Sequence, residues 1–330
     1  MSPGPRAVAV LNPVTGRRRA GELEALLRAT LERRFDLEIV RTGSPGEARA
    51  LARRAAQHAR IVIAVGGDGT VSDVASGVID TGAALAIIPT GSTNVVARSL
   101  GIPLDPVTAA RMLLRPLVVR RLDVATDGDR LTLHMAGAGF DALMLRDARR
   151  DWKRAAAWLA YVPSAVRHLS EPPWHFELCI DGVVHRVTAH MVLVANGAFI
   201  INRWFRMGRS ISPDDGILDV CVFAPTRRLG IATMALWVLV GSVDRSRYYH
   251  QFRGRDVLLS AVPPAPIELD GDFAGWTPVH FRMRAAALRV VVPGPPGTGT
   301  AGEWLDLDPH ERPQTDAPCD HGQAAAISCR

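Results

Sequence analysis

The sequence predicts a fold of the α/β plus β class, with an N-terminal doubly wound α/β domain and a β-sandwich-like C-terminal domain. Two patterns support this prediction. Residues 7–114 alternate short apolar runs with segments of helical periodicity, and beyond residue 118 the runs become short, β-rich and separated by Asp-Gly turns. A length of 330 residues also favours two domains. We expect them at 1–117 and 118–293, followed by a disordered tail over 294–330.

The first half alternates strands with helices. Its apolar, largely β-branched runs are typical of buried parallel strands, and the segments between them repeat apolar residues every three to four positions. Ligands of such sheets collect at the carboxyl ends of the strands. We expect strands at 7–11, 37–40, 61–65 and 85–88, and helices at 22–35, 46–58, after Thr70, after Asn94 and at 106–114.

The second half is β-rich, with two helices. We expect strands at 118–125, 131–135, 175–181, 183–195, 217–223, 257–259, 267–269 and 288–292, and helices at 152–169 and 229–243. The longest uncharged stretch, within 229–243, is shorter than the roughly 20 residues that a membrane-spanning helix requires. We therefore expect no transmembrane segment.

The chain is basic, with a formal charge of +6. A basic surface favours anionic partners such as nucleotide phosphates, anionic lipid headgroups or nucleic acid. Nucleic acid is the least favoured of these, because the arginines are spread along the chain and no recognition motif is present. The four cysteines show no paired metal-ligand spacing, which indicates a reducing compartment.

A glycine-rich turn joins the predicted strand 61–65 to the helix after it. The turn reads Gly66-Gly67-Asp68-Gly69-Thr70. Glycines at the start of a helix expose backbone N–H groups without Cβ obstruction, so phosphates can approach closely. A carboxylate at Asp68 would repel bare phosphate, and it suits a site where it meets a metal cation or a hydroxyl proton. The alternative is that Asp68 only caps the helix.

Two further loops come after strands of the same predicted sheet. One runs from Asn12 to Gly16 and is followed by three arginines, and the other holds Gly91, Ser92 and Asn94. Taken alone, the first is an ordinary basic connection and the second ordinary helix capping. On one sheet edge with the glycine turn, they predict the walls of a nucleotide cleft.

Six short motifs together resemble a known family. Each motif is weak alone, and the Gly-Gly-Asp-Gly turn also occurs in NAD kinases and phosphofructokinases. Their order and approximate spacing resemble the diacylglycerol kinase and sphingosine kinase family, particularly its soluble bacterial lipid kinases, over nearly all of residues 7–293. The motifs are Asn12-Pro-Val-Thr-Gly16, Gly66-Gly-Asp-Gly-Thr70, Pro89-Thr-Gly-Ser-Thr-Asn94, Asn196-Gly197, Asp214-Asp-Gly216 and Leu269-Asp-Gly-Asp272.

The resemblance implies an ATP- and Mg²⁺-dependent lipid kinase that phosphorylates diacylglycerol or a related lipid in a cleft between two domains. Asp272 would accept the proton, and Asp68 would organise Mg²⁺ and the phosphates. A structural metal would be held by Ser212, Asp215 and the backbone of Ile217. The residues implied to line the ATP site are Asn12, Pro13, Val14, Thr15, Gly16, Thr42, Gly66, Gly67, Asp68, Gly69, Thr70, Val71, Ser72 and Ser92.

Three positions depart from the family pattern. Asp272 and Asp73 stand where glutamate is usual, and Val95 stands where an aspartate is common. These changes keep open a nucleotide- and lipid-binding regulator with weakened turnover. A kinase of a soluble hydroxyl compound such as NAD is the other alternative, disfavoured by the motifs of the second half.

The chain offers candidate surfaces for a membrane. The apolar segment 229–240 carries Trp237 between arginines, although a buried helix of the second domain explains it slightly better. The segment 203–209 mixes aromatic residues with arginine. A weaker candidate lies at 152–161. We expect a cytoplasmic enzyme that associates peripherally and transiently with a membrane surface, with a homodimer left open.

Overall fold

The structure is a computed structural model that describes residues 4–294, except residues 15, 17, 116, 148–167, 169–170, 200–206, 209–210 and 226–227. The predicted tail beyond residue 294 and the candidate surface at 152–161 lie outside the described residues. So do most of the predicted helix 152–169 and of the segment 203–209. In the described part of the chain, no helix has both the length and the apolar character needed to span a bilayer.

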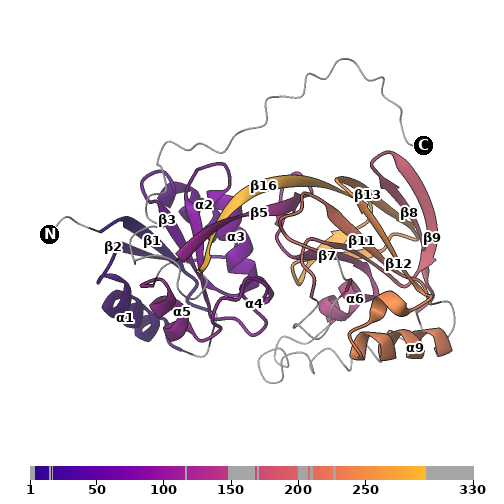
Figure 1. The fold of residues 1–330 in the computed structure, drawn as a ribbon, viewed down its shortest axis with the longest axis horizontal. Coiled ribbons are helices and arrows are strands. Elements are labelled where there is room, and N and C mark those ends of the chain that lie inside the picture. The colour runs from indigo at the N-terminus through magenta and orange to yellow at the C-terminus, as the bar shows by residue number, and fades with distance from the viewer. Residues whose placement is uncertain are drawn as a thin grey trace, which may run out of the picture.

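The first half forms the predicted open parallel sheet. Its strands pair in the order β2-β1-β3-β4, all parallel, and every residue of β3 and β4 is buried. Helices α1 and α5 pack together on one face, and α2 packs on α3 on the other (Figure 1). The strands are β1 (Arg6–Leu11), β2 (Asp36–Arg41), β3 (Ile61–Gly66) and β4 (Ala84–Pro89), and the helices are α1 (Ala20–Leu31), α2 (Glu47–Ala55), α3 (Asp68–Val78), α4 (Val95–Ser99) and α5 (Pro106–Met112).

The second half forms a β-sandwich, as the sequence predicts. A six-stranded antiparallel sheet, in the order β12-β11-β10-β7-β14-β15, packs against the part of the larger sheet that contains β8, β9 and β13. Its elements are β5 (Leu117–Thr126), β6 (Leu131–Thr132), β7 (Met135–Gly139), α6 (Phe140–Asp147), β8 (Trp174–Ile180), β9 (Val183–Ala189), β10 (Met191–Ala195), β11 (Leu218–Phe223), α9 (Arg228–Leu239), η2 (Val243–Arg245), β12 (Tyr249–Gly254), β13 (Asp256–Val262), β14 (Pro266–Leu269), β15 (Asp272–Trp276) and β16 (Val279–Pro293).

The core between the two sheets is apolar on both sides. Strand β8 alternates buried and less buried residues, and its inward side chains Phe176 and Leu178 are almost fully covered. They meet residues such as Val192, Val220 and Ile267 from the facing sheet. A smaller apolar cluster on the other face of the six-stranded sheet contains residues of α9. The helix predicted at 229–243 is thus observed as α9, and some of its side chains pack on this sheet.

Several element boundaries differ from the sequence expectation. Helix α3 begins at Asp68 inside the glycine turn, rather than after Thr70. The expected strand 131–135 is broken, because the backbone N–H groups of Leu133, His134 and Met135 donate to the Asp270 carboxylate instead of to a neighbouring strand. The expected strand 183–195 is two strands that belong to different sheets. Elements α6, β12 and β15 were not expected.

Strand β16 connects the two halves of the molecule. Its first part pairs with β13, its length pairs with β5, and Val290 near its end pairs in parallel with Leu85 of β4. A bulge lies in its middle, where Ala286 has a φ of +50°. In Figure 1, β16 and β5 arch from the first half to the second. One ten-stranded sheet thus runs through both halves; the division at residues 117 and 118 stays a prediction.

Candidate functional site

Three loops converge at the carboxyl ends of β1, β3 and β4. The Asn12 side-chain N–H (Nδ2) donates to Thr70 Oγ1 at 3.1 Å, which joins the loop after β1 to the glycine turn. A Cβ added to Gly91 would lie 2.7 Å from Gly67 Cα, so glycine is required where the loops after β3 and β4 meet. A Cβ on Gly16, whose φ is +98°, would lie 3.1 Å from Thr90 O. The loops that the sequence assigned to one cleft are neighbours.

The glycine turn leaves backbone N–H groups at the start of α3. Its N-cap residue, Gly67, provides no side-chain cap. A Cβ on Gly66 would lie 2.4 Å from Thr70 Oγ1, so only glycine lets Thr70 fold back toward Asn12. Uncapped N–H groups and the positive end of the helix dipole favour an anion at this position.

Asp68 lies in this turn and faces the second half of the chain. Its Oδ1 accepts a hydrogen bond from the Val96 N–H at 3.5 Å. Burial raises the pKa of Asp68 to about 6, and the nearby Asp270 carboxylate acts in the same direction, while the hydrogen bond from the Val96 N–H opposes it. A buried carboxylate of this kind is readily stabilised by a cation.

Asp270 and Asp272 flank the turn between β14 and β15. The Asp270 carboxylate accepts the N–H groups of Leu133 at 2.8 Å, His134 at 2.9 Å and Met135 at 3.1 Å. Burial still raises the pKa of Asp270 to about 6. These bonds fix the turn against the segment 133–135, and so fix the position of Asp272.

Asp272 meets the glycine turn of the first half. A Cβ placed on Gly69 would lie 3.1 Å from Asp272 Oδ2, so the carboxylate rests against the bare backbone at the start of α3. The side chain of Asp272 is exposed. Burial raises the pKa of Asp73, one turn along α3, and the charge of Asp272 raises it further. Residues more than 190 positions apart in the chain therefore share one site.

A second layer of buried carboxyl groups supports this turn. Glu268 Oε2 accepts the N–H of Gly271 at 2.6 Å. Burial raises the pKa of Glu268 well above its ordinary value, and the nearby Asp141 adds to the shift. Burial also raises the pKa of Asp141 to about 7. Burial therefore favours the neutral form of Glu268, which holds the turn with less negative charge beneath Asp272.

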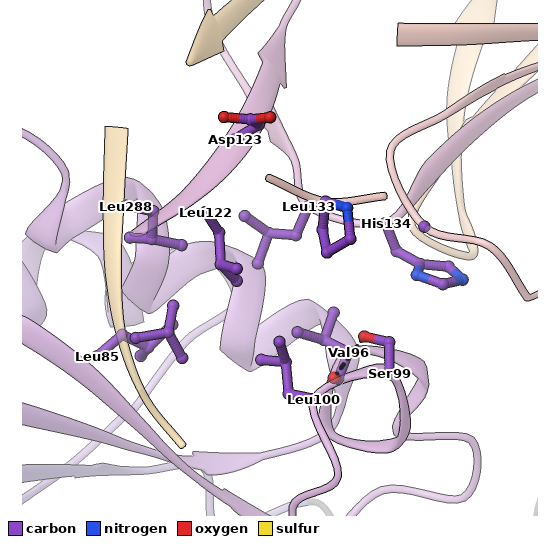
Figure 2. Close-up of a pocket in the computed structure, with 12 residues that line it drawn as sticks. Leu85, Val96, Ser99, Leu100, Leu122, Asp123, Leu133, His134 and Leu288 are labelled. Atoms are coloured by element: carbon purple, nitrogen blue, oxygen red, sulfur yellow. Dashed lines mark hydrogen bonds between the residues drawn. The ribbon is translucent and has the colours of Figure 1, made fainter. Parts of the chain in front are cut away.

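A small cavity lies between the two halves beside this site (Figure 2). Leu85, Val96 and Leu100 of the first half face Leu122, Leu133 and Leu288 of the strands that cross over. His134 and Asp123 also line this cavity, which has room for about one water molecule. Burial lowers the pKa of His134, whose Nε2 is hydrogen-bonded to the Phe199 carbonyl, so the imidazole beside Asp68 is neutral.

Some residues expected at the ATP site point elsewhere. Val71 is buried in the first half's core, and Ser72 Oγ donates to the Leu131 carbonyl at 3.1 Å. Thr42 is nearly buried after β2, with its N–H bonded to the Leu11 carbonyl at 2.9 Å. Thr15 lies outside the described residues. The exposed members of the set are Pro13, Val14, Gly16, Gly69 and Ser92.

The expected structural-metal site is occupied by internal polar contacts. Ser212 Oγ donates to Asp214 Oδ1 at 2.6 Å, and Asp215 is ion-paired with Arg253 and accepts the Ile217 N–H at 3.2 Å. Among the described residues, no three His, Cys, Asp or Glu side chains are arranged to hold a metal ion. Arginine, rather than an open set of oxygen ligands, faces Asp215. The Asp215 carboxylate is thus paired with Arg253 in this structure, and the assignment of a structural metal to these residues stays a prediction.

Sequence reasoning did not single out three residues that organise the site. Asp270 falls inside the motif at 269–272 and Asp123 inside the expected strand 118–125, and no sequence pattern marks His134. Asp123 accepts the N–H groups of Gly216 at 2.5 Å and Ala286 at 2.7 Å, which ties the Asp-Asp-Gly loop to the bulge of β16. The Asp270-Gly271 sequence predicts a turn. The hydrogen-bond partners of Asp123 and His134 are distant in sequence, so no local pattern predicts them.

Comparisons with known proteins agree with this arrangement. A model of the diacylglycerol kinase catalytic domain matches residues 6–126, and a model of the YegS C-terminal NAD kinase beta sandwich-like domain matches residues 134–292. A Pseudomonas putida protein named "Probable lipid kinase YegS-like" is 30% identical over 266 residues, covering 78% of this chain and 85% of the relative. The diacylglycerol kinase of Bacillus subtilis is 25% identical over 295 residues, covering 87% and 96%.

Solved structures share the fold. A diacylglycerol kinase from Bacillus anthracis superposes with a TM-score of 0.73 at 22% sequence identity, covering 88% of this chain and 97% of that one. The two family models together span both halves of the present chain, in the order in which the structure places them. The chain belongs to the diacylglycerol kinase family, in the group that joins this catalytic domain to a YegS-type β-sandwich domain.

Proposed function

We propose that this protein is a kinase that transfers the γ-phosphate of ATP, with Mg²⁺, to a hydroxyl group of diacylglycerol or a related lipid. The observation that carries the proposal is the position of Asp272 Oδ2 beside Gly69, where an added Cβ would lie 3.1 Å from this oxygen. It brings an exposed carboxylate of the second half against a phosphate-binding turn of the first. Phosphoryl transfer chiefly requires alignment of the two substrates and neutralisation of charge.

The first half suits the nucleotide. The phosphates would lie on the N–H groups at the start of α3, next to Gly66, Gly67 and Gly69, with Asn12 and Thr70 closing the neighbouring loop. Mg²⁺ prefers carboxylate oxygens, and Asp68 offers such oxygens at the right end of the turn. When bound, Mg²⁺ would neutralise phosphate charge. The N–H groups at the start of α3 would hold the phosphates in line with the acceptor hydroxyl.

The second half suits the acceptor. Asp272 would accept the proton of the lipid hydroxyl as that oxygen attacks the phosphorus, and its exposure leaves the carboxylate open to an incoming substrate. The backbone bonds to Asp270 hold the turn that carries it. Asp272 is one methylene shorter than the glutamate usual in the family, and the position of its carboxylate beside Gly69 supports sufficient reach.

A lipid is the favoured acceptor. The names of the Pseudomonas putida and Bacillus subtilis relatives indicate lipid kinases, and both domain models cover the corresponding halves of this chain. A lipid substrate implies a protein that works in the cytoplasm and visits a membrane surface.

The test is transfer of labelled phosphate from ATP, with Mg²⁺, to a panel of lipids in mixed micelles, run beside NAD and soluble sugars. We expect a diacylglycerol or related lipid to be labelled. Asp68→Ala should abolish labelling, whereas Asp36→Ala, an exposed carboxylate at the start of the edge strand β2, should leave it unchanged. Labelling of NAD alone would contradict the lipid assignment. Nucleotide binding without transfer to any acceptor would favour a regulator.

A further inference from the structure

An exposed aromatic pair lies immediately beside Asp272. Phe273 is 42% exposed and Trp276 is 51% exposed, and they are the aromatic members of the exposed large hydrophobic side chains in the described residues. Their rings meet edge to face with centroids 6.2 Å apart. Contiguous exposed apolar surface next to a reactive group is characteristic of a binding surface.

A β-bulge places both rings on one side of the hairpin. In a regular strand, side chains three positions apart point to opposite faces. In β15, Phe273 pairs with Glu268 and Gly275 pairs with Ile267, which leaves Ala274 as the extra residue. The bulge turns the strand and reorients the residues after it. The pair is thus a consequence of local backbone geometry, and not of chance exposure along a strand.

Two arginines contact the strand segment that carries the aromatic pair. The Arg146 guanidinium of α6 lies 5.8 Å from the centre of the Trp276 ring, and Arg130 donates to the Ala274 carbonyl at 3.1 Å. Arg146 also pairs with Asp147 at 2.8 Å. We call the set Arg130, Arg146, Phe273 and Trp276 the hairpin patch. Aromatic rings with arginines at their margin suit the headgroup layer of a bilayer, where the rings enter the interface and the guanidinium groups meet phosphates.

We propose that the hairpin patch docks on the surface of a phospholipid bilayer that contains anionic lipids, and so presents the acceptor hydroxyl to Asp272. This inference rests on the proposed function. Phe273 directly follows Asp272, so their Cα atoms are about 3.8 Å apart. A membrane lipid whose hydroxyl reaches the Asp272 carboxylate must bring its headgroup layer against the same hairpin. The exposed pair and the surrounding arginines match that layer in polarity and charge.

Helix α9 offers a competing surface. Leu236 is 59% exposed and Val240, directly after the helix, is 62% exposed. Both surfaces are exposed, but only the hairpin patch includes residues of the strand that begins with Asp272. The experiment therefore compares the two surfaces directly.

The first measurement is binding of the protein to vesicles of phosphatidylcholine and phosphatidylglycerol, and cosedimentation measures the bound fraction. Phe273→Ser with Trp276→Ser should weaken binding at least tenfold, and Arg146→Ala should weaken it further in combination. Val183→Ser with Val184→Ser, which changes two exposed valines of β9, is the matched control and should bind normally. Unchanged binding of the Phe273 and Trp276 variant, or loss only with Leu236→Ser and Val240→Ser, would overturn the proposal.

The second measurement places Trp276 in the bilayer. Phospholipids brominated near the headgroup quench tryptophan fluorescence on contact, and Trp276→Phe should remove most of the quenching seen in the wild-type protein. Equal quenching in both proteins would contradict insertion of the hairpin. MgATP binding of each variant confirms that the nucleotide half is folded.

Activity separates failure of this inference from failure of the proposed function. The Phe273 and Trp276 variant should lose at least tenfold in phosphorylation of diacylglycerol in vesicles, with a much smaller loss on a short-chain diacylglycerol dispersed as monomers. Equal losses on both would show that the pair acts in the site and not at the membrane. No phosphorylation of either lipid by the wild type would reject the kinase assignment, while the binding and quenching results would still test the membrane contact.

Discussion

Asp68 and Asp270 show what folding does to single carboxylates at this site. Burial raises the pKa of each to about 6, although Asp270 accepts three backbone N–H groups. Near neutral pH these two buried carboxylates therefore carry negative charges that burial makes unfavourable. A bound cation would offset that cost. The charge is placed where MgATP would bind, so the free protein carries a stability cost for its function.

Asp68→Asn should stabilise the free protein at pH 7. Because the pKa of Asp68 is raised from 3.8 to about 6, the folded state holds its proton more tightly than the unfolded state, and stability falls as the pH rises from about 4 to about 6. Removing the charge should recover about 1–3 kcal/mol at pH 7 and nothing near pH 4. Urea unfolding at several pH values, without nucleotide or Mg²⁺, measures this difference.

Asp214→Asn provides a control of opposite sign. A hydrogen bond from Ser212, and then Arg120, lowers the pKa of Asp214, so its charge contributes stability that is present at pH 7 and lost as the pH falls through its folded-state pKa. This variant should be less stable than the wild type at pH 7, with the difference disappearing in acid. If both variants shift stability equally at every pH, the burial argument for Asp68 is wrong.

Residue-level prediction from sequence was uneven for a physical reason. Asp68 could be identified because a carboxylate inside a glycine turn is locally unusual. His134 and Asp123 could not, because their environments depend on partners such as Phe199 and Ala286 that lie 65 and 163 positions away. Sequence patterns report neighbours along an element, and these residues act across elements.

At the scale of elements, α3 carries two glycines with opposite purposes. Gly69 lies at the exposed start of the helix, where a Cβ would meet only the Asp272 carboxylate, at 3.1 Å. Gly77 lies near the end, where a Cβ would lie 2.5 Å from the Arg49 carbonyl and 2.6 Å from Ala52 Cβ of α2. One glycine leaves room for the Asp272 carboxylate, and the other lets two helices pack closely.

The two glycines predict opposite results for the same substitution. Gly69→Ala should leave the free energy of unfolding unchanged or raise it by up to about 1 kcal/mol, because alanine favours the helix, while turnover falls at least tenfold as Asp272 is displaced. Gly77→Ala should lower the free energy of unfolding by about 1–3 kcal/mol through overpacking. Urea unfolding and lipid phosphorylation, measured on both variants, test the pair. Normal turnover in Gly69→Ala would show that Asp272 is not positioned by this contact.

Most elements of the first half were predictable, since buried parallel strands are continuous apolar runs and the helices between them are amphipathic. The second half was harder to divide. The break after Thr132 arises because Asp270, far along the chain, takes the N–H groups of Leu133 to Met135. Strand β15 was not expected because it begins with the polar Asp272 and contains a bulge.

At the scale of the whole molecule, β16 makes the two halves interdependent. It adds to the parallel strands of the first half beside β4 and to the sandwich beside β13, and no local pattern in residues 279–293 indicates these distant partners. Asp123 ties its bulge to the Asp-Asp-Gly loop. The site between the halves therefore depends on a strand from the end of the described chain.

A shared sheet predicts a single unfolding transition. None of the seven tryptophans lies in the first half, and Trp174, Trp237 and Trp276 lie in described elements of the second, so tryptophan fluorescence reports the second half. Most described helices lie in the first half and dominate far-UV circular dichroism. Urea unfolding followed by both signals should give coincident curves. Two separated midpoints would show that the halves unfold independently and that β16 does not couple them.

The most direct test of the central claim is phosphate transfer by Asp272 variants with labelled ATP, Mg²⁺ and diacylglycerol, under single-turnover conditions. Asp272→Asn should bind ATP normally and lose at least a hundredfold in transfer rate, because its amide cannot take the hydroxyl proton. Asp272→Glu should keep substantial transfer. Normal transfer by Asp272→Asn would contradict the account, since the carboxylate that the fold brings to the glycine turn would then have no part in the reaction.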